Sequence, residues 1–98
     1  MTSYARTEVV RLLELEEGFL ESLEQESIVF FDEGERYSPR MVERIRVAHS
    51  LVFDLEVNLS GVAVILRMRE EIGSMQSVLD RVHALLRERG LDDVIEHD

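Results

Sequence analysis

The chain has 98 residues, a length that fits one domain, and 45% of them are hydrophobic, so it can bury a core and is not a disordered acidic tail. Cysteine is absent, which excludes disulfides, thiolate metal sites and cysteine catalysis. The formal net charge is −10, with 21 acidic residues against 11 basic ones, and all of the basic residues are arginine. Phosphate backbones repel a chain this acidic, so nucleic-acid binding would need a locally basic surface.

The sequence contains no targeting or membrane signal that we can identify. Its longest apolar run, Val62 to Leu66, is far too short to span a bilayer. Charged residues Arg6 and Glu8 stand close behind Tyr4, where a signal peptide would have its apolar core. We therefore expect a soluble cytoplasmic protein.

Two short helices are predicted in the first quarter of the chain. Thr7 is a plausible N-cap for the first, and Glu16 and Glu17 would open the second, because acidic side chains suit the positive end of the helix dipole. A link of a few residues around Glu14 and Leu15 would make the two a helix-turn-helix pair. The apolar face of the first helix holds Val9, Val10 and Leu13, and that of the second holds Phe19, Leu20 and Leu23.

A small β-hairpin, or wing, is predicted next. The apolar run 28–31 (Ile-Val-Phe-Phe) favours a strand, and residues 32–35 favour a turn in which Gly34 can adopt a positive φ. Arg36–Tyr37 would be the return strand. A hairpin of this size is marginal alone, so it must pack on the helices.

Ser38 and Pro39 form the clearest helix start in the chain, because serine caps a helix and proline at the first helical position loses no hydrogen bond. The helix should run to about Phe53. We expect its outer side to carry Arg40, Arg44 and Arg46, and its apolar stripe to consist of Met41, Val42, Ile45, Ala48 and Val52.

A last long helix should start at an N-cap at Asn58, continue through Gly73 and stop near Gly90. Its apolar positions alternate in steps of three and four, which is typical of a coiled coil that forms a homodimer, while an amphipathic helix packed on its own domain is the alternative. This seam consists of Ile65, Met68, Ile72, Met75, Leu79, Val82 and Leu86. The predicted organisation is a domain at 1–69, a dimerisation helix at 70–90 and an acidic tail at 91–98.

The charge is unevenly distributed along the chain. Residues 1–35 carry ten acidic residues against two arginines, a net charge of −8. Residues 36–89 carry nine arginines against seven acids, and residues 90–98 add four acids. The first third of the chain is therefore either a solvated acidic face or a docking surface for a basic partner.

Two stretches resemble the MerR superfamily of winged-helix proteins. Residues 36–39 (RYSP) and the helix that follows are similar to the "RxYS" entry to the third helix of that superfamily. Residues 57–66 (VNLSGVAVIL) are similar to "GVNLAGVEVIL" of the heat-shock repressor HspR and to "DWPGIAVAL" of the chaperone modulator CbpM. Residues 7–9 (TEV), 16–17 (EE) and 28–29 (IV) match the truncated CbpM pattern. The resemblance covers residues 4–72.

The resemblance implies a mainly α fold, a MerR-like winged helix-turn-helix with a small β-hairpin and a C-terminal coiled-coil helix, with antiparallel pairing in a dimer. DNA-binding members carry an arginine in the second helix where this chain has Glu21, followed by Ser22. Such a helix would meet phosphate with like charge. CbpM-like proteins instead bind the J-domain of DnaJ-type co-chaperones and so regulate the Hsp70 (DnaK) system. On this reading the partner-binding residues are Glu17, Glu21, Glu24, Glu26, Asp32 and Glu33.

The alternative is an HspR-like DNA-binding regulator of heat-shock genes, with DnaK or a small ligand as effector. Its backbone contacts would be Arg36, Arg40 and Arg44. A structural dimer module of another complex is a third hypothesis. We expect no enzyme, metal or cofactor, because the three histidines are scattered without metal-ligand spacing and there is no glycine-rich phosphate loop.

Overall fold

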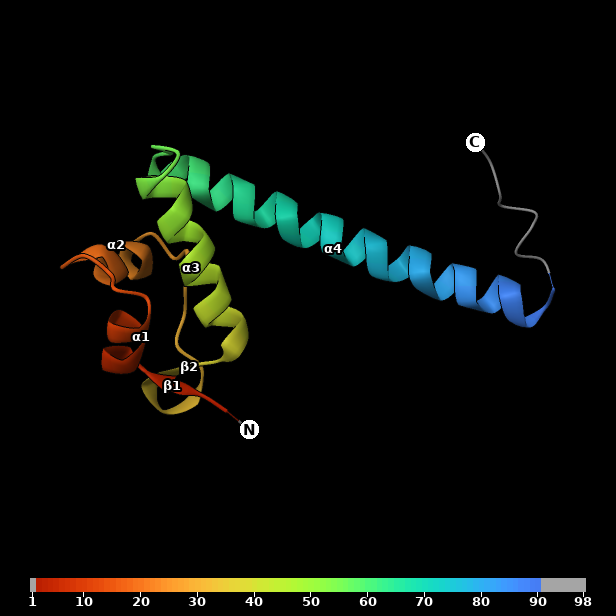
Figure 1. Ribbon diagram of the computed structural model, residues 1–98, viewed down its shortest axis with the longest axis horizontal. Coiled ribbons are helices and arrows are strands. Elements are labelled where there is room, and N and C mark those ends of the chain that lie inside the picture. The colour runs from red at the N-terminus through yellow and green to blue at the C-terminus, as the bar shows by residue number, and fades with distance from the viewer. Residues whose placement is uncertain (1, 91–98) are drawn as a thin grey trace. The chain divides into compact units, whose positions relative to one another are not determined.

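The computed structural model describes residues 2–90 and is mainly helical, with one small antiparallel sheet (Figure 1). The chain divides into two compact units, unit 1 (Met1–Leu66) and unit 2 (Arg67–Asp98). The elements in chain order are β1 (Tyr4–Ala5), α1 (Arg6–Leu12), α2 (Phe19–Gln25), the 3-10 turn η1 (Glu33–Glu35), β2 (Arg36–Tyr37), α3 (Pro39–Phe53) and α4 (Leu59–Glu88).

The sheet joins two segments that are far apart in the sequence. β1 and β2 are antiparallel, with Tyr4 opposite Tyr37 and Ala5 opposite Arg36. The prediction that Arg36–Tyr37 is a strand is confirmed, but its partner is the start of the chain and not residues 28–31.

Residues 28–31 do not form a strand. The backbone amide and carbonyl of Ile28 are bonded to groups outside any sheet, and the side chains of the run do not alternate between two faces. The Ile28 amide donates to the Leu23 carbonyl oxygen at 2.9 Å, and the Ile28 carbonyl oxygen accepts from Arg44 Nε at 2.5 Å. Ile28 and Val29 are both buried, whereas successive strand residues point to opposite faces. The run therefore fills the core directly after α2. The turn that follows is as predicted, with Gly34 at φ 68°.

The expected cap of the first helix is wrong. α1 begins at Arg6, so Thr7 lies inside the helix. The N-cap is Ala5, whose backbone is still extended as the last residue of β1. The Ala5 amide donates to the Glu8 carboxylate at 2.8 Å, so Glu8 satisfies the donor at the helix start.

The second helix also starts later than predicted. Glu16 and Glu17 lie in the link, and α2 begins at Phe19 after Gly18, which adopts a left-handed conformation at φ 81°. A left-handed residue cannot continue a right-handed helix, so Gly18 separates the two glutamates from α2. The link between the helices is therefore longer than expected.

The start and end of α3 are as predicted. The Ser38 hydroxyl accepts from the Met41 amide at 3.2 Å, Pro39 is the first helical residue, and the helix ends at Phe53. Ile45 and Ala48 of its apolar stripe are fully buried, and the other stripe residues pack against the same core. The buried core of unit 1 consists of Val9, Leu15, Phe19, Leu20, Leu23, Ile28, Val29, Tyr37, Ile45, Ala48, Val62 and Leu66.

α4 also follows the prediction at both ends. The Asn58 side chain accepts from the Gly61 amide at 2.8 Å, the helix passes Gly73 without a break, and Gly90 at φ 69° follows its last turn. The predicted acidic tail, 91–98, lies outside the described residues. Within residues 2–90, no helix is long and apolar enough to cross a membrane.

Candidate partner-binding surface

The four glutamates proposed for the partner surface occupy different settings around α2. Glu17 lies in the link before Gly18, Glu21 and Glu24 lie within α2, and Glu26 is the residue that caps its end. Glu17, Glu21 and Glu26 are exposed, whereas Glu24 is half-buried. The four carboxylates therefore cannot act as one equivalent set.

Glu24 is held inside unit 1 by two partners. Its carboxylate pairs with the Arg6 guanidinium and accepts a hydrogen bond from the Tyr37 hydroxyl, and only 24% of its side chain is exposed. Burial and the hydrogen bond to Glu24 both raise the pKa of the fully buried Tyr37, so its hydroxyl stays a donor. The prediction that Glu24 belongs to a docking surface has no support in this geometry, because its carboxylate joins α1, α2 and β2.

Arg6 also contacts the outer carboxylate of α2. Its guanidinium lies 3.1 Å from Glu21, whose side chain remains 59% exposed. A hydrogen bond to its own backbone, and then the Arg6 hydrogen bond, lower the pKa of Glu21. The hydrogen bond to Glu24 is the main cause of the raised pKa of Arg6. Glu21 stays ionised and accessible, with its charge partly balanced by Arg6.

Of the two acidic residues proposed in the turn, Asp32 and Glu33, only Asp32 has a side chain that the structure describes. The exposed Asp32 carboxylate accepts from the Ser38 amide at 2.9 Å, so it helps to fix the entry to α3. The Glu33 side chain lies outside the described part of the structure, although its backbone forms η1. Asp32 therefore has a structural task whether or not it also contacts a partner.

The three arginines proposed for a DNA backbone all have interactions within the chain. Arg36 donates from Nε to the Ser3 hydroxyl at 2.7 Å and from its other guanidinium nitrogen to the Ser3 carbonyl oxygen at 3.0 Å, and it lies 3.5 Å from Glu8. Arg44 is half-buried against Ile28, so its expected place on the outer side of α3 is wrong. Arg40 is exposed.

A cluster that the sequence reasoning missed lies where the link meets α3. Glu16 Oε1 is 2.6 Å from His49 Nε2, and this hydrogen bond lowers the pKa of Glu16. The His49 ring lies 5.4 Å from Phe19 and 4.6 Å from Phe53, measured between ring centroids. No local pattern could pair Glu16 with His49, because 33 residues separate them and only the packing of the link on α3 joins them.

The seam proposed for dimerisation runs from Ile65, near the end of unit 1, to Leu86 in unit 2. Ile65 and Leu86 are half-buried. The five residues between them have 42–63% of their surface exposed: Met68, Ile72, Met75, Leu79 and Val82. These five exposed apolar side chains form a continuous stripe along α4 at the spacing typical of a coiled-coil face.

The described part of the chain contains no candidate metal site, since residues 2–90 hold no group of three or more His, Cys, Asp or Glu side chains placed to bind an ion.

Comparison with known proteins gives no relative: no protein-family model matches the chain, and no curated protein or solved structure matches it.

Proposed function

We propose that the protein is a chaperone modulator, a MerR-like winged helix of the CbpM-like branch that binds the J-domain of a DnaJ-type co-chaperone and thereby regulates the Hsp70 (DnaK) system. The resemblance of residues 4–72 to the MerR superfamily supports the choice of family. The two short helices α1 and α2, the small sheet of β1 and β2 and the capped helix α3 support a winged helix-turn-helix.

One observation carries the choice of a protein partner over DNA. The second helix presents Glu21, with Glu17 before it and Glu26 after it, all exposed, while Arg36 and Arg44 are engaged by groups of the same chain. Phosphate would meet like charge at the helix that would enter a groove, and Arg36 and Arg44 already have partners within the chain. A basic protein helix fits this surface better than a nucleic acid does.

Binding to the J-domain of a DnaJ-type co-chaperone tests the proposal. Glu17→Arg with Glu26→Arg reverses two exposed carboxylates and leaves the Glu24 contacts intact, and we expect roughly tenfold weaker binding with a reduced dependence on salt. Asp80→Arg with Glu88→Arg is the matched control, because it makes the same charge change on two exposed residues of α4 that are not part of the seam.

The same samples discriminate the regulator hypothesis. A gel shift at low salt on DNA from upstream of the protein's own coding region should show no sequence-dependent band. A band that depends on sequence, or a J-domain that fails to bind at low micromolar concentration in low salt, would overturn the proposal.

A further inference from the structure

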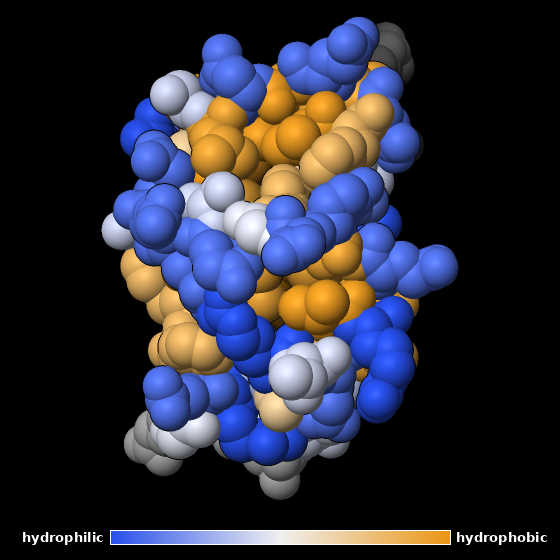
Figure 2. Space-filling view, turned by 90° about the vertical axis from the view of Figure 1, so that its left-hand side faces the viewer, coloured by the Kyte–Doolittle hydropathy of each residue, from blue (hydrophilic) through white to orange (hydrophobic). Residues whose placement is uncertain are grey.

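Two large apolar side chains stay exposed where α3 ends. Phe53, the last residue of α3, has 44% of its surface exposed, and Leu55, two residues later, has 67%. The end of α3 lies at the top of unit 1 in Figure 1, and Figure 2 shows apolar residues gathered toward the top of the face that it presents, bordered by hydrophilic residues. We call Glu16, Glu17 and residues 53–56 the Phe53 corner.

The apolar centre of this corner is held in place. The Phe53 ring packs at 5.3 Å from Phe19 and at 4.6 Å from His49, measured between centroids, so its orientation is set by the core edge beneath it. The chain after α3 is fixed by two backbone hydrogen bonds, from the Leu55 amide to Ser50 at 3.3 Å and from the Val57 amide to Leu51 at 2.9 Å. A preorganised apolar pair loses little conformational entropy when a partner covers it.

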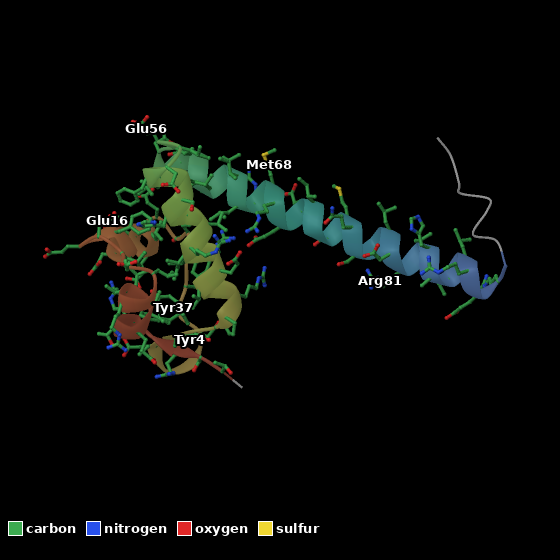
Figure 3. The ribbon with its side chains drawn as sticks, in the orientation of Figure 1. Tyr4, Glu16, Tyr37, Glu56, Met68 and Arg81 are labelled. Atoms are coloured by element: carbon green, nitrogen blue, oxygen red, sulfur yellow. The ribbon has the colours of Figure 1, made fainter. Side chains whose placement is uncertain are left out.

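The charge around this pair has one sign. Asp54 and Glu56 follow Phe53 and Leu55 directly in sequence, and Glu16, which is followed by Glu17, hydrogen-bonds to His49 beside Phe53. Figure 3 shows Glu16 and Glu56 in the upper part of unit 1. No arginine occurs at positions 12–35 or 47–66, the two stretches within which the residues of the corner lie, and the neighbouring His49 is bonded to Glu16. In the described part of the chain, no hydrogen bond or ion pair engages the side chains of Glu17, Asp54 and Glu56.

We infer that the Phe53 corner is the docking surface for a basic protein segment that inserts an apolar side chain between Phe53 and Leu55. The inference rests on the proposed function and names where on the domain the partner is seated. Charge selects this occupant, because a second copy of the corner, an anionic lipid surface and a nucleic acid would all bring like charge to four carboxylates. A basic amphipathic helix supplies both the cations and the apolar anchor.

The test compares Leu55→Ser with Leu85→Ser, two exposed leucines, the second of which lies in unit 2. Each variant of the full chain is titrated with a DnaJ-type J-domain and with a synthetic amphipathic helix of lysine and leucine, and a peptide with glutamate in place of lysine serves as the charge control. We expect Leu55→Ser to weaken both interactions about tenfold, as for an apolar anchor, and Leu85→Ser to leave them within about twofold. Circular dichroism checks that both variants fold.

The outcomes separate the inference from the proposed function. Equal J-domain affinity for the wild type and Leu55→Ser would overturn the inference and leave the proposed function standing. Suppose that the protein binds the lysine–leucine peptide, that Leu55→Ser weakens this binding, and that no J-domain binds. This result would support the inference and overturn the proposed function. A change in oligomeric mass in Leu55→Ser would assign the corner to a second copy and overturn the inference, and the absence of both interactions would overturn both.

Discussion

Tyr37, fully buried on β2, donates its hydroxyl hydrogen bond to the carboxylate of Glu24 on α2. The same carboxylate pairs with Arg6 at the start of α1. One acidic side chain thus joins three elements, in a setting where a charge-assisted hydrogen bond is stronger than at the surface. The residue that looked in sequence like part of an acidic docking face is a structural link.

Removing either partner of this link should destabilise the fold. We expect Tyr37→Phe to cost about 1–2 kcal/mol of unfolding free energy, because it deletes a buried donor at nearly constant volume. We expect Glu24→Gln to cost at least as much, because Arg6 then loses one of its two carboxylate partners and keeps only Glu21. Urea denaturation measures both. Tyr4→Phe is the control, since its hydroxyl has no hydrogen-bond partner among residues 2–90, and equal stability of all four proteins would contradict the link.

The two glycines of α4 should respond to alanine in opposite directions. A Cβ at Gly61 would lie 2.7 Å from Val57 Cγ1, so Gly61→Ala must displace a β-branched side chain and should destabilise the protein. A Cβ at Gly73 meets nothing within 4 Å, so Gly73→Ala should gain about 0.5–1 kcal/mol of helix propensity. Thermal unfolding of the two variants decides, and a stabilised Gly61→Ala would show that the contact with Val57 is not restrictive.

Self-association should depend on the seam of α4. Leu79→Lys places a charge in the exposed apolar stripe, whereas Ser77→Lys places the same charge two residues away, outside it. Sedimentation should give a dimer for the wild type and for Ser77→Lys and a monomer for Leu79→Lys. A wild type that is monomeric at its highest soluble concentration would contradict the coiled coil.

Stability should fall in acid partly through Glu16. Its pKa is lowered in the folded protein by the hydrogen bond to His49, so the folded state binds fewer protons than the unfolded chain near the ordinary value of 4.5. Its contribution is therefore complete above that value and is lost as the pH falls below it. Glu16→Gln should be less stable than the wild type at pH 7, with a difference that disappears in acid, while Glu17→Gln should match the wild type throughout.

Local signals predicted the long helices well. Ser38 with Pro39, and Asn58 three residues before Gly61, act through hydrogen bonds between neighbours in sequence, so the pattern contains all the partners that matter. The stripe around Ile45 and Ala48 was also predicted, because one helix face repeats within the helix itself. These features required no knowledge of the rest of the chain.

The sheet and the site depended on distant partners. Residues 28–31 have the composition of a strand, but the strand next to Arg36–Tyr37 comes from Tyr4–Ala5, and a two-residue strand has no periodicity to detect. Charge alone could not distinguish Glu24 from Glu21, because Arg6 contacts both of them and only Glu24 is half-buried and bonded to the Tyr37 hydroxyl. Glu16 and His49 were unremarkable in sequence for the same reason.

The pairing of β1 with β2 has a kinetic consequence. Arg36 and Ser3 bond across 33 positions, so the chain must close a long loop before this contact stabilises anything. Contacts of such sequence separation form late in folding, after the helices that are held by neighbours. The strand that leads into α3 is thus fastened to the beginning of the chain in the last steps of folding.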